Sequence, residues 1–224
     1  MIFENSQDTF ILDESVIPKG VTRLGIKLSG GADSAIVCYM LAKYIKEERP
    51  EIGLFPITCV AEGKAYQEIF AKKVINKIEE LLDFKFGTHY VEHVRADNSE
   101  NYTGDQDAFV FKLYDQKLIQ QHFAGINAMP DKEDAPELYD VNEDMLPSDD
   151  RSKQKVKRPH TNGSSTRPLI NVDKKGVAEH YNRLGVMDTL FPMTRSCEEY
   201  TDDFSNHCGW CWFCLERNWG FGKL

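Results

Sequence analysis

The fold of this chain is decided by Leu24-Gly25-Ile26-Lys27-Leu28-Ser29-Gly30-Gly31-Ala32-Asp33-Ser34, which passes from an apolar strand through a glycine turn into a helix. We expect the strand over 24–28 and the helix over 33–46, where apolar residues recur at helical spacing. Adjacent glycines let backbone N–H groups approach an anion closely, and a helix N-terminus adds a partial positive charge. The stretch therefore predicts a phosphate-binding loop.

The polar residues of this loop indicate which phosphate it holds. Ser29 and Ser34 add hydroxyl donors, and Asp33 places a carboxylate beside the phosphates, which makes chemical sense when a divalent cation bridges them. The combination indicates a nucleoside triphosphate with Mg²⁺. No Lys follows the glycines as in a Walker A loop, and the adjacent Gly30 and Gly31 do not fit the dinucleotide fingerprint. The simpler alternative is a turn that ends a strand, with Asp33 and Ser34 capping the helix.

Apolar and helical segments alternate beyond the loop, after a polar lead-in over 1–22. We expect further strands over 53–60, 88–94 and 123–127, and further helices over 64–82, 105–121 and 174–184. The strand over 53–60 is mostly apolar, as a buried parallel strand should be. This alternation predicts an α/β fold with a doubly wound, Rossmann-like parallel sheet that binds its ligand at the carboxyl ends of the strands.

Length and composition narrow the class of protein. The 224 residues are enough for one α/β domain with a small appended module. The sequence has neither an 18-residue apolar run nor a basic and then apolar leader, so we expect a cytoplasmic protein without a membrane partner. A net charge of −9 favours a small-molecule substrate and disfavours nucleic acid without excluding it.

Residues 130–167 interrupt the alternation of strands and helices. Nine acidic residues lie between 131 and 150, and a basic stretch follows from 151 to 167. Two interpretations stay open for this long charged insertion. It is either a solvated surface segment or a lid whose basic half closes over a triphosphate or an anionic substrate.

The C-terminal part of the chain carries the second strong signal, four closely spaced cysteines: Cys197, Cys208, Cys211 and Cys214. Four thiolates complete a tetrahedral structural zinc site and leave no open position for a substrate. An iron–sulfur cluster is the main alternative, and disulfides do not suit a cytosolic chain. We therefore expect a zinc knuckle over 195–224, appended to a main domain over 1–194.

Two further cysteines stand apart from this group. Cys38 lies within the first expected helix, where we expect it to pack as a small apolar residue. Cys59 lies near the carboxyl end of the second expected strand, where chemistry takes place in such folds. A buried structural thiol is the simpler interpretation of Cys59.

The SGGADS run resembles the signature of the PP-loop ATP pyrophosphatases, which split ATP into AMP and pyrophosphate. Within them, the chain resembles the 7-cyano-7-deazaguanine synthases in the segments 124–131, 167–174, 194–197 and 208–221. That family is cytosolic, usually homodimeric, and carries one zinc per chain. It uses ATP to adenylate a 7-deazaguanine carboxylate, takes ammonia to form the amide, and dehydrates the amide to a nitrile.

The resemblance also implies roles for individual residues. Asp33 and Lys174 would take part in catalysis, with Lys174 as a cation for phosphate charge or, in the simpler view, a solvated lysine at a helix start. Cofactor contacts would come from Ser29, Gly30, Gly31, Ala32, Asp33 and Ser34 for pyrophosphate and Mg²⁺, from Thr58 and Cys59 near the adenine, and from Asn127 and Asp131 at the end of the fourth strand. The family's Tyr-Gly-Gln-Arg-His and Pro-x-Arg-Asn segments, which shape the substrate pocket, have no counterpart at 61–68 and 101–105.

Three functions remain for comparison with the structure. The first is an ATP-dependent ligase or nitrile synthase that acts on a small carboxylate. The second is a PP-loop enzyme that transfers sulfur to tRNA, with Cys59 as the sulfur carrier and 151–167 as an RNA-binding arm. The third is a nucleotide-binding regulatory module without catalysis, against which the intact SGGADS run argues.

Overall fold

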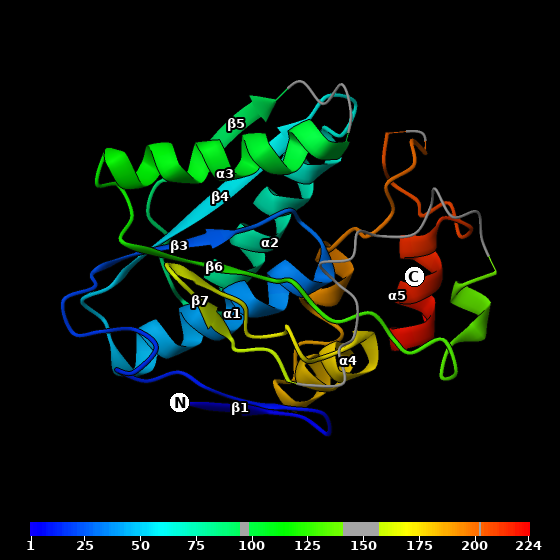
Figure 1. The fold of residues 1–224 in the computed structure, drawn as a ribbon, viewed down its shortest axis with the longest axis horizontal. Helices are drawn as coiled ribbons and strands as arrows, with labels where there is room; N and C mark the ends of the chain where they lie inside the picture. The colour runs from blue at the N-terminus through cyan, green and yellow to red at the C-terminus, as the bar shows by residue number, and fades with distance from the viewer. Residues whose placement is uncertain (95–98, 141–156, 202) are drawn as a thin grey trace.

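A computed structural model describes residues 1–94, 99–140, 157–201 and 203–224. Its central sheet has six strands in the order β5-β4-β3-β6-β8-β7, and all neighbouring pairs are parallel except β7 with β8 (Figure 1). The strands are β3 (Arg23–Lys27), β4 (Gly53–Ala61), β5 (Tyr90–Val94), β6 (Gln121–Ala124), β7 (Thr161–Asn162) and β8 (Ser165–Thr166). The order reverses direction between β3 and β6, which confirms the expected α/β class with its mostly parallel sheet.

Helices cover both faces of this sheet. The larger core contains Leu24 and Ile26 of β3 together with the apolar sides of α1 (Ala32–Glu48) and α2 (Tyr66–Leu82). The smaller core joins Phe55 and Ile57 of β4 to α3 (Ser99–Asp115) on the opposite face. Because successive residues of a strand point to opposite faces, β4 contributes apolar side chains to both cores.

The remaining helices lie beyond the carboxyl ends of the strands, where α5 packs against α4 (Figure 1). They are α4 (Lys174–Arg183), α5 (Trp212–Phe221) and the short 3₁₀ turns η1 (Pro136–Leu138) and η4 (Phe191–Met193). The sequence did not predict α5, because the cysteines dominate that segment. None of the helices in the described ranges combines the length and the apolar character needed to cross a bilayer.

The polar lead-in over 1–22 contains a structure that the sequence did not predict. An antiparallel hairpin of β1 (Ile2–Glu4) and β2 (Thr9–Ile11) buries Phe3 and Phe10 against the larger core. The turn between the two strands reaches α4, where Gln7 Nε2 donates to Asp173 Oδ1 at 2.7 Å. The hairpin is therefore tied to the element that carries Lys174.

Two predicted elements had wrong bounds at both ends: the helix expected over 105–121, and the strand expected over 123–127, which ends at Ala124. The helix expected over 105–121 is α3, which begins at Ser99 and ends at Asp115. It ends there because Lys117 adopts a left-handed conformation (φ 57°) and the N–H of Leu118 bonds back to the carbonyl of Leu113. The next strand consequently starts two residues early, at Gln121 rather than at residue 123.

The charged insertion is partly described. Its first part contains η1, and its last part contains the β7–β8 hairpin, which extends the sheet beyond β6. Residues 141–156, which hold part of the acidic run and the start of the basic run, lie outside the described residues.

Candidate functional site

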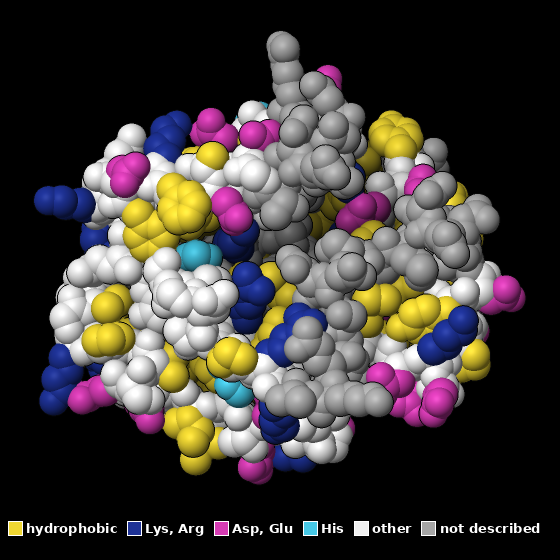
Figure 2. Space-filling model, viewed as in Figure 1, with side chains coloured by type: hydrophobic (Ala, Val, Ile, Leu, Met, Phe, Trp, Pro, Cys, Tyr) yellow, Lys and Arg dark blue, Asp and Glu magenta, His cyan; other side chains and the backbone are white. Residues whose placement is uncertain are grey.

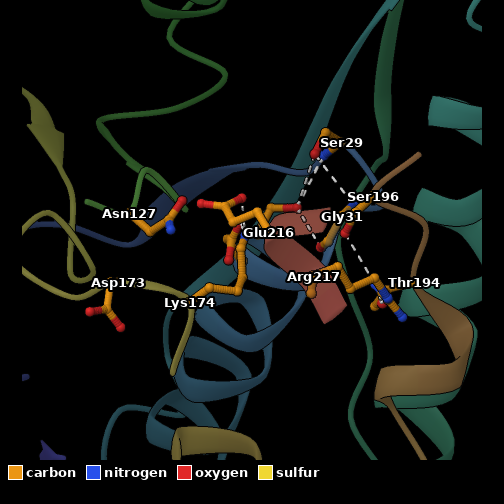
Figure 3. A network of polar contacts seen from close by, with 12 residues as sticks. Ser29, Gly31, Asn127, Asp173, Lys174, Thr194, Ser196, Glu216 and Arg217 are labelled. Carbon is orange, nitrogen blue, oxygen red and sulfur yellow. Dashed lines mark hydrogen bonds and ion pairs between the residues drawn. The ribbon is translucent and has the colours of Figure 1, made fainter. Parts of the chain in front are cut away.

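The glycine loop connects β3 to α1, as the sequence predicts, and its serines hold it in shape. Ser34 Oγ donates to the carbonyl of Gly31 at 3.1 Å and accepts from the N–H of Ser29 at 3.3 Å. Ser29 Oγ in turn accepts from the N–H of Gly31 at 3.4 Å. These long contacts close a small ring at the start of α1 (Figure 3).

The N-terminus of α1 has backbone N–H groups that could bind an anion. Gly31 is the N-cap, and no side chain from the described part of the chain caps it. Gly30 adopts φ +79°, and a Cβ at that position would lie 2.6 Å from Phe70 Cβ and 2.8 Å from the backbone N of Ala71. Only glycine fits there, because both the dihedral angle and the packing against α2 exclude a side chain. The exposed N–H groups of the first turn therefore point into open space at the strand ends.

A cavity of about 260 Å³ opens beside the loop at the carboxyl ends of β3, β4 and β6. It is lined by Ser29, Gly31, Asp33 and Ser34 from the loop and by Ile57 and Cys59 from β4. Val110 and Gln106 of α3 close its other side. The mix of apolar walls and loop donors suits an apolar ring that leads to phosphates.

A second cavity, of about 370 Å³, shares the loop and extends away from β4 toward α4 and α5. Its walls are strongly polar, with four cations and three carboxylates besides amide and hydroxyl groups: Lys27, Arg167, Lys174 and Arg195; Asp33, Glu198 and Glu216. Asp107 of α3 adds a further carboxylate. On the face seen in Figure 2, Lys and Arg side chains gather near the middle, although the whole chain has a net charge of −9.

Lys174 is the central charged group at the loop. Its side chain is only 3% exposed, and Nζ lies 2.6 Å from Asp33 Oδ2 and 3.2 Å from Glu216 Oε2 (Figure 3). Asp173 caps α4 and accepts from the N–H groups of Lys175 and Gly176, which fixes Lys174 as the first residue of the helix. The alternative of a solvated lysine is therefore wrong.

The other carboxylate of this group comes from α5. Glu216 is 1% exposed, and Gly220 lies one turn further along the same helix. A Cβ on Gly220 would lie 2.4 Å from Lys174 Cγ, so the glycine makes room for the lysine stem. Asp33 Oδ1 is buried and has no hydrogen-bond partner among the described residues, which leaves this oxygen open to a ligand.

The four C-terminal cysteines converge as predicted. The sulfur atoms of Cys197, Cys208, Cys211 and Cys214 all lie within 4.8 Å of one another, which is a geometry that could hold a metal ion. Backbone N–H groups of Cys208 and Cys211 donate to the sulfurs of Cys197 and Cys208, each at 3.3 Å. A hydrogen bond from the Cys214 thiol lowers the pKa of Cys211, which favours its thiolate form.

Two buried arginines join the cysteine segment to the loop. The N–H of Arg195 donates to the carbonyl of Gly30 at 2.9 Å, and its guanidinium donates to carbonyls of Glu199, Phe204 and Asn206. Arg217 of α5 donates to Thr194 Oγ1 and Ser196 Oγ and stacks on Phe191 at 3.8 Å. Burial lowers the pKa of Arg217 to about 10, so it stays protonated at neutral pH.

Most of the residues predicted for catalysis and cofactor binding line the two cavities, and four do not. Ser29, Gly31, Asp33, Ser34, Cys59, Asn127 and Lys174 line one or both of them. Ala32 is buried in the first turn of α1, and Gly30 supports the loop from behind. Thr58 is buried between strands, where Oγ1 donates to the carbonyl of Leu28 at 2.7 Å and meets His89 Nε2. Asp131 is exposed and lines neither cavity.

Several lining residues escaped the sequence analysis, chiefly Lys27, Gln106, Arg167, Arg195, Ser196, Glu198, Phe213 and Glu216. Lys27 could have been found, because it ends an apolar strand at the edge where ligands bind. Glu216 gives no such signal, since a single acid within a helical segment usually faces solvent.

The comparisons with known proteins add a likeness of fold. No protein-family model matches the chain, and no curated protein matches its sequence. Among solved structures, it is similar to the U34-tRNA thiolase NcsA from Methanococcus maripaludis, solved with its 4Fe-4S cluster, at a TM-score of 0.47 and 15% identity, covering 91% of this chain and 72% of that chain. It is also similar to NAD⁺ synthetase from Burkholderia pseudomallei, at a TM-score of 0.45 and 10% identity, covering 94% and 79% of the two chains.

Proposed function

We propose that the protein is an ATP-dependent ligase of the PP-loop type, which adenylates a small carboxylic acid, releases pyrophosphate, and lets ammonia displace AMP. One observation carries this proposal: two cavities of different character meet at one phosphate loop. The partly apolar cavity suits adenosine, and the polar one suits an acceptor. The α-phosphorus of ATP would lie at their junction, where an acceptor oxygen can reach it.

The side chains around the loop suit pyrophosphate as a leaving group. The N–H groups of α1, the hydroxyls of Ser29 and Ser34, and the ammonium of Lys174 all converge there. Negative charge builds on the phosphates as the bond to the α-phosphorus breaks, and fixed donors stabilise that charge without rearranging. Asp33 would then help to hold a divalent cation rather than touch the phosphates directly.

The residues present fit Mg²⁺. A hard cation prefers oxygen ligands, and Asp33 Oδ1 is a buried oxygen with no hydrogen-bond partner in the described ranges. The trio of Asp33, Lys174 and Glu216 also carries more negative than positive charge before any nucleotide binds. When bound, Mg²⁺ would neutralise phosphate charge at this position.

The four-cysteine centre fits zinc in a structural role. Zinc–sulfur bonds of about 2.3 Å place tetrahedral ligands about 3.8 Å apart. Cys208 Sγ and Cys214 Sγ lie 3.8 Å apart, and all four sulfurs are within 4.8 Å of one another. A four-iron cluster gives each cysteine its own iron and holds the sulfurs farther apart, so the close spacing favours a single ion.

The acceptor that the sequence resemblance supports best is a 7-deazaguanine carboxylate, which would become 7-cyano-7-deazaguanine through the amide. Sulfur transfer to tRNA has one supporting observation, the position of Cys59 in the adenosine cavity. However, burial raises the pKa of Cys59 to about 11, so its sulfur is a neutral thiol and a weak nucleophile at neutral pH. The ligase reaction is therefore the one we propose.

The products formed from ATP test this proposal. We expect AMP and pyrophosphate when the protein is incubated with ATP, Mg²⁺, ammonium and a 7-deazaguanine carboxylate, measured by ³¹P NMR and chromatography. Omission of the carboxylate should stop AMP formation. ADP and phosphate as products would contradict the whole reading, and AMP that forms only with tRNA would favour sulfur transfer.

A further inference from the structure

Arg167 lies at the edge of the sheet where the second cavity opens. It directly follows β8, whose Thr166 is level with Phe123 of β6, and the next residue of β6, Ala124, is level with Lys27 of β3. Residues level with one another on neighbouring strands share a face, so Lys27 and Arg167 lie on the face that α3 covers. Both line the second cavity from that side.

The other cations of this cavity already have partners. Lys174 is held by Asp33 and Glu216, and Lys27 lies 3.5 Å from Asp107. The Arg195 guanidinium is taken up by three backbone carbonyls and the hydroxyl of Thr201. Lys27 and Arg195 therefore have little capacity left for a further anion, and Lys174 is the cation that we assign to pyrophosphate.

Arg167 differs from these three cations. Its guanidinium has no hydrogen bond or ion pair with any residue that the structure describes, whereas Arg195 shares with it only a buried, unpartnered Nε. A buried donor without a partner is costly and rare in folded proteins. The natural partner of a guanidinium is an oxyanion, which it binds with two parallel hydrogen bonds. The second cavity thus offers one uncommitted, fork-shaped anion site.

The position of Arg167 decides which anion it meets. β8 is two strands from β3, so its end lies about 10 Å across the sheet from the phosphate loop. The adenosine cavity extends the opposite way, toward Ile57 and Cys59 of β4. An anion at Arg167 therefore belongs to neither the terminal phosphates nor the nucleoside, but to the acceptor.

His122 lies close to the positive charges of Lys27 and Arg167. It lies on β6 between the strands of Lys27 and Arg167, and its Nδ1 meets the hydroxyl of Tyr114 at 2.8 Å. Burial first, and then the nearby Lys27 and Arg167, lower the pKa of His122 to about 4. The imidazole stays neutral at neutral pH, so the charge that this wall presents to a ligand comes from Lys27 and Arg167.

We propose that Arg167 is the specificity residue for the acceptor and binds its carboxylate at the junction with the α-phosphate. This inference rests on the proposed adenylating function. In that step a carboxylate oxygen forms a bond to the α-phosphorus, and the bond from that phosphorus to the bridging oxygen of pyrophosphate breaks. Two anions must meet for this reaction, and a guanidinium beside them reduces their repulsion while leaving one carboxylate oxygen free to attack. The site therefore selects acids over their neutral amides.

The test compares Arg167→Gln and Arg167→Lys with the wild type. Saturation-transfer NMR and calorimetry would measure binding of matched pairs, each a small planar carboxylic acid and its carboxamide, with the 7-deazaguanine pair among them. We expect Arg167→Gln to weaken acid binding about 10- to 100-fold and to leave amide and ATP binding unchanged, because it removes one charge-assisted contact. Arg167→Lys should keep part of the acid preference. Arg183→Gln, on the exposed side of α4, serves as the control.

The outcomes separate the two proposals. A wild-type protein that prefers none of the acids to their amides, or an Arg167→Gln variant that keeps the preference, overturns the role of Arg167. Neither result affects AMP and pyrophosphate formation, which tests the ligase reaction independently. Loss of ATP binding in Arg167→Gln with acid preference intact would assign the arginine to the nucleotide instead, and would likewise overturn the proposal.

Discussion

At the scale of single residues, Lys174 holds the site together. It is buried between Asp33 of the phosphate loop and Glu216 of α5, so one ammonium serves two carboxylates. Removing such an ammonium takes the counter-charge away from the buried carboxylate of Glu216 and from the partly buried one of Asp33, which is far more costly than never having had the pair. The same ammonium faces the place where pyrophosphate would leave. Stability and activity therefore depend on one atom, and substitutions can separate them.

Lys174→Met should lose both properties. We expect a loss of about 3 kcal/mol in the free energy of unfolding, since both carboxylates lose this counter-charge, and about a 100-fold slower formation of AMP. Chemical denaturation and product analysis measure the two effects. Adding Glu216→Gln to Lys174→Met should restore much of the stability but none of the rate. A double variant that recovers AMP formation would show that the ammonium does not act on the phosphates.

Gly220→Ala tests the position of Lys174 without changing any charge. The new Cβ would lie 2.4 Å from Lys174 Cγ and 2.6 Å from its Cβ, so the lysine stem must move. We expect weaker ATP binding and a loss of about 1–2 kcal/mol in stability, the usual cost of overpacking. Gly222→Ala, where a Cβ meets nothing within 4 Å, controls for the glycine loss, although its φ of +68° adds strain of its own. Calorimetry with ATP should find the affinity reduced only in Gly220→Ala.

At the scale of elements, α5 connects the four-cysteine cluster to the glycine loop and the cavities beside it. The helix begins directly after Cys211, includes Cys214, and carries Glu216 and Arg217 on its buried side. Arg217 holds the strand-like segment Thr194-Arg195-Ser196, whose middle residue bonds to the phosphate loop. The cysteines are thus linked to the loop in two ways. Glu216 reaches it through Lys174, and Arg217 reaches it through the segment 194–196.

Removal of the metal should therefore weaken ATP binding, although none of the four clustered cysteines lines either cavity. Cys59, which lines the adenosine cavity, is not one of the four. Without the ion, four clustered sulfurs no longer hold the start of α5, and Glu216 loses its fixed position beside Lys174. We expect a chelator to lower the melting temperature and to raise the Kd for ATP about tenfold. Restored affinity on adding zinc back is the control. An unchanged Kd in metal-free protein of lower melting temperature would show that α5 is held by packing alone.

Prediction from sequence succeeded where the residues of one short stretch were enough to identify an element. The strand, glycine turn and helix of 24–46 can be recognised because apolar periodicity, glycines and helix-start residues agree within a short stretch. The end of α3 was misplaced because Lys117 ends it in a left-handed conformation, which glycine adopts far more often than lysine does. Glu216 and Arg167 could not be assigned at all, since Glu216 depends on Lys174 of a different helix and Arg167 follows a strand too short and polar to give a signal.

At the scale of the whole molecule, the N-terminal hairpin and α4 form one unit with the core. His180 of α4 meets Asn5 of the hairpin at 2.8 Å and is buried. Burial lowers its pKa to about 4, as it does for His122 on the opposite side of the sheet. Both imidazoles are therefore neutral in the folded protein at any pH above about 4, whereas the unfolded chain protonates them near pH 6.5.

Stability should consequently fall as the pH drops from 6.5 toward 4. In that range the unfolded chain binds more protons than the folded one, so each proton taken up favours unfolding; above it the contribution is complete. We expect a loss of about 2 kcal/mol per histidine by about pH 5. Urea unfolding at several pH values measures this slope, and His122→Asn with His180→Asn should reduce it to the part contributed by His207, whose pKa burial also lowers to about 4. A double variant with a slope as steep as that of the wild type would place the titrating groups elsewhere.

The α/β architecture followed from the sequence, but the hairpin did not. Residues 1–22 look polar because the strands of the hairpin are only three residues long and bury every second side chain. Its role depends on Gln7 and Asn5 reaching α4 across the molecule, and no local pattern encodes such contacts. The cavities share this dependence, since the second is lined by segments from β3 to α5.

The ion pairs of Lys174 with Asp33 and Glu216 have a consequence for folding while the chain is being synthesised. A ribosome releases the phosphate loop early and α5 late, so a growing chain carries a loop whose counter-charges have not yet been made. Nucleotide cannot help such a chain to fold, because the binding site that we propose includes residues as far along as Glu216. ATP should therefore stabilise the finished protein but give no protection to a nascent chain that stops before α5.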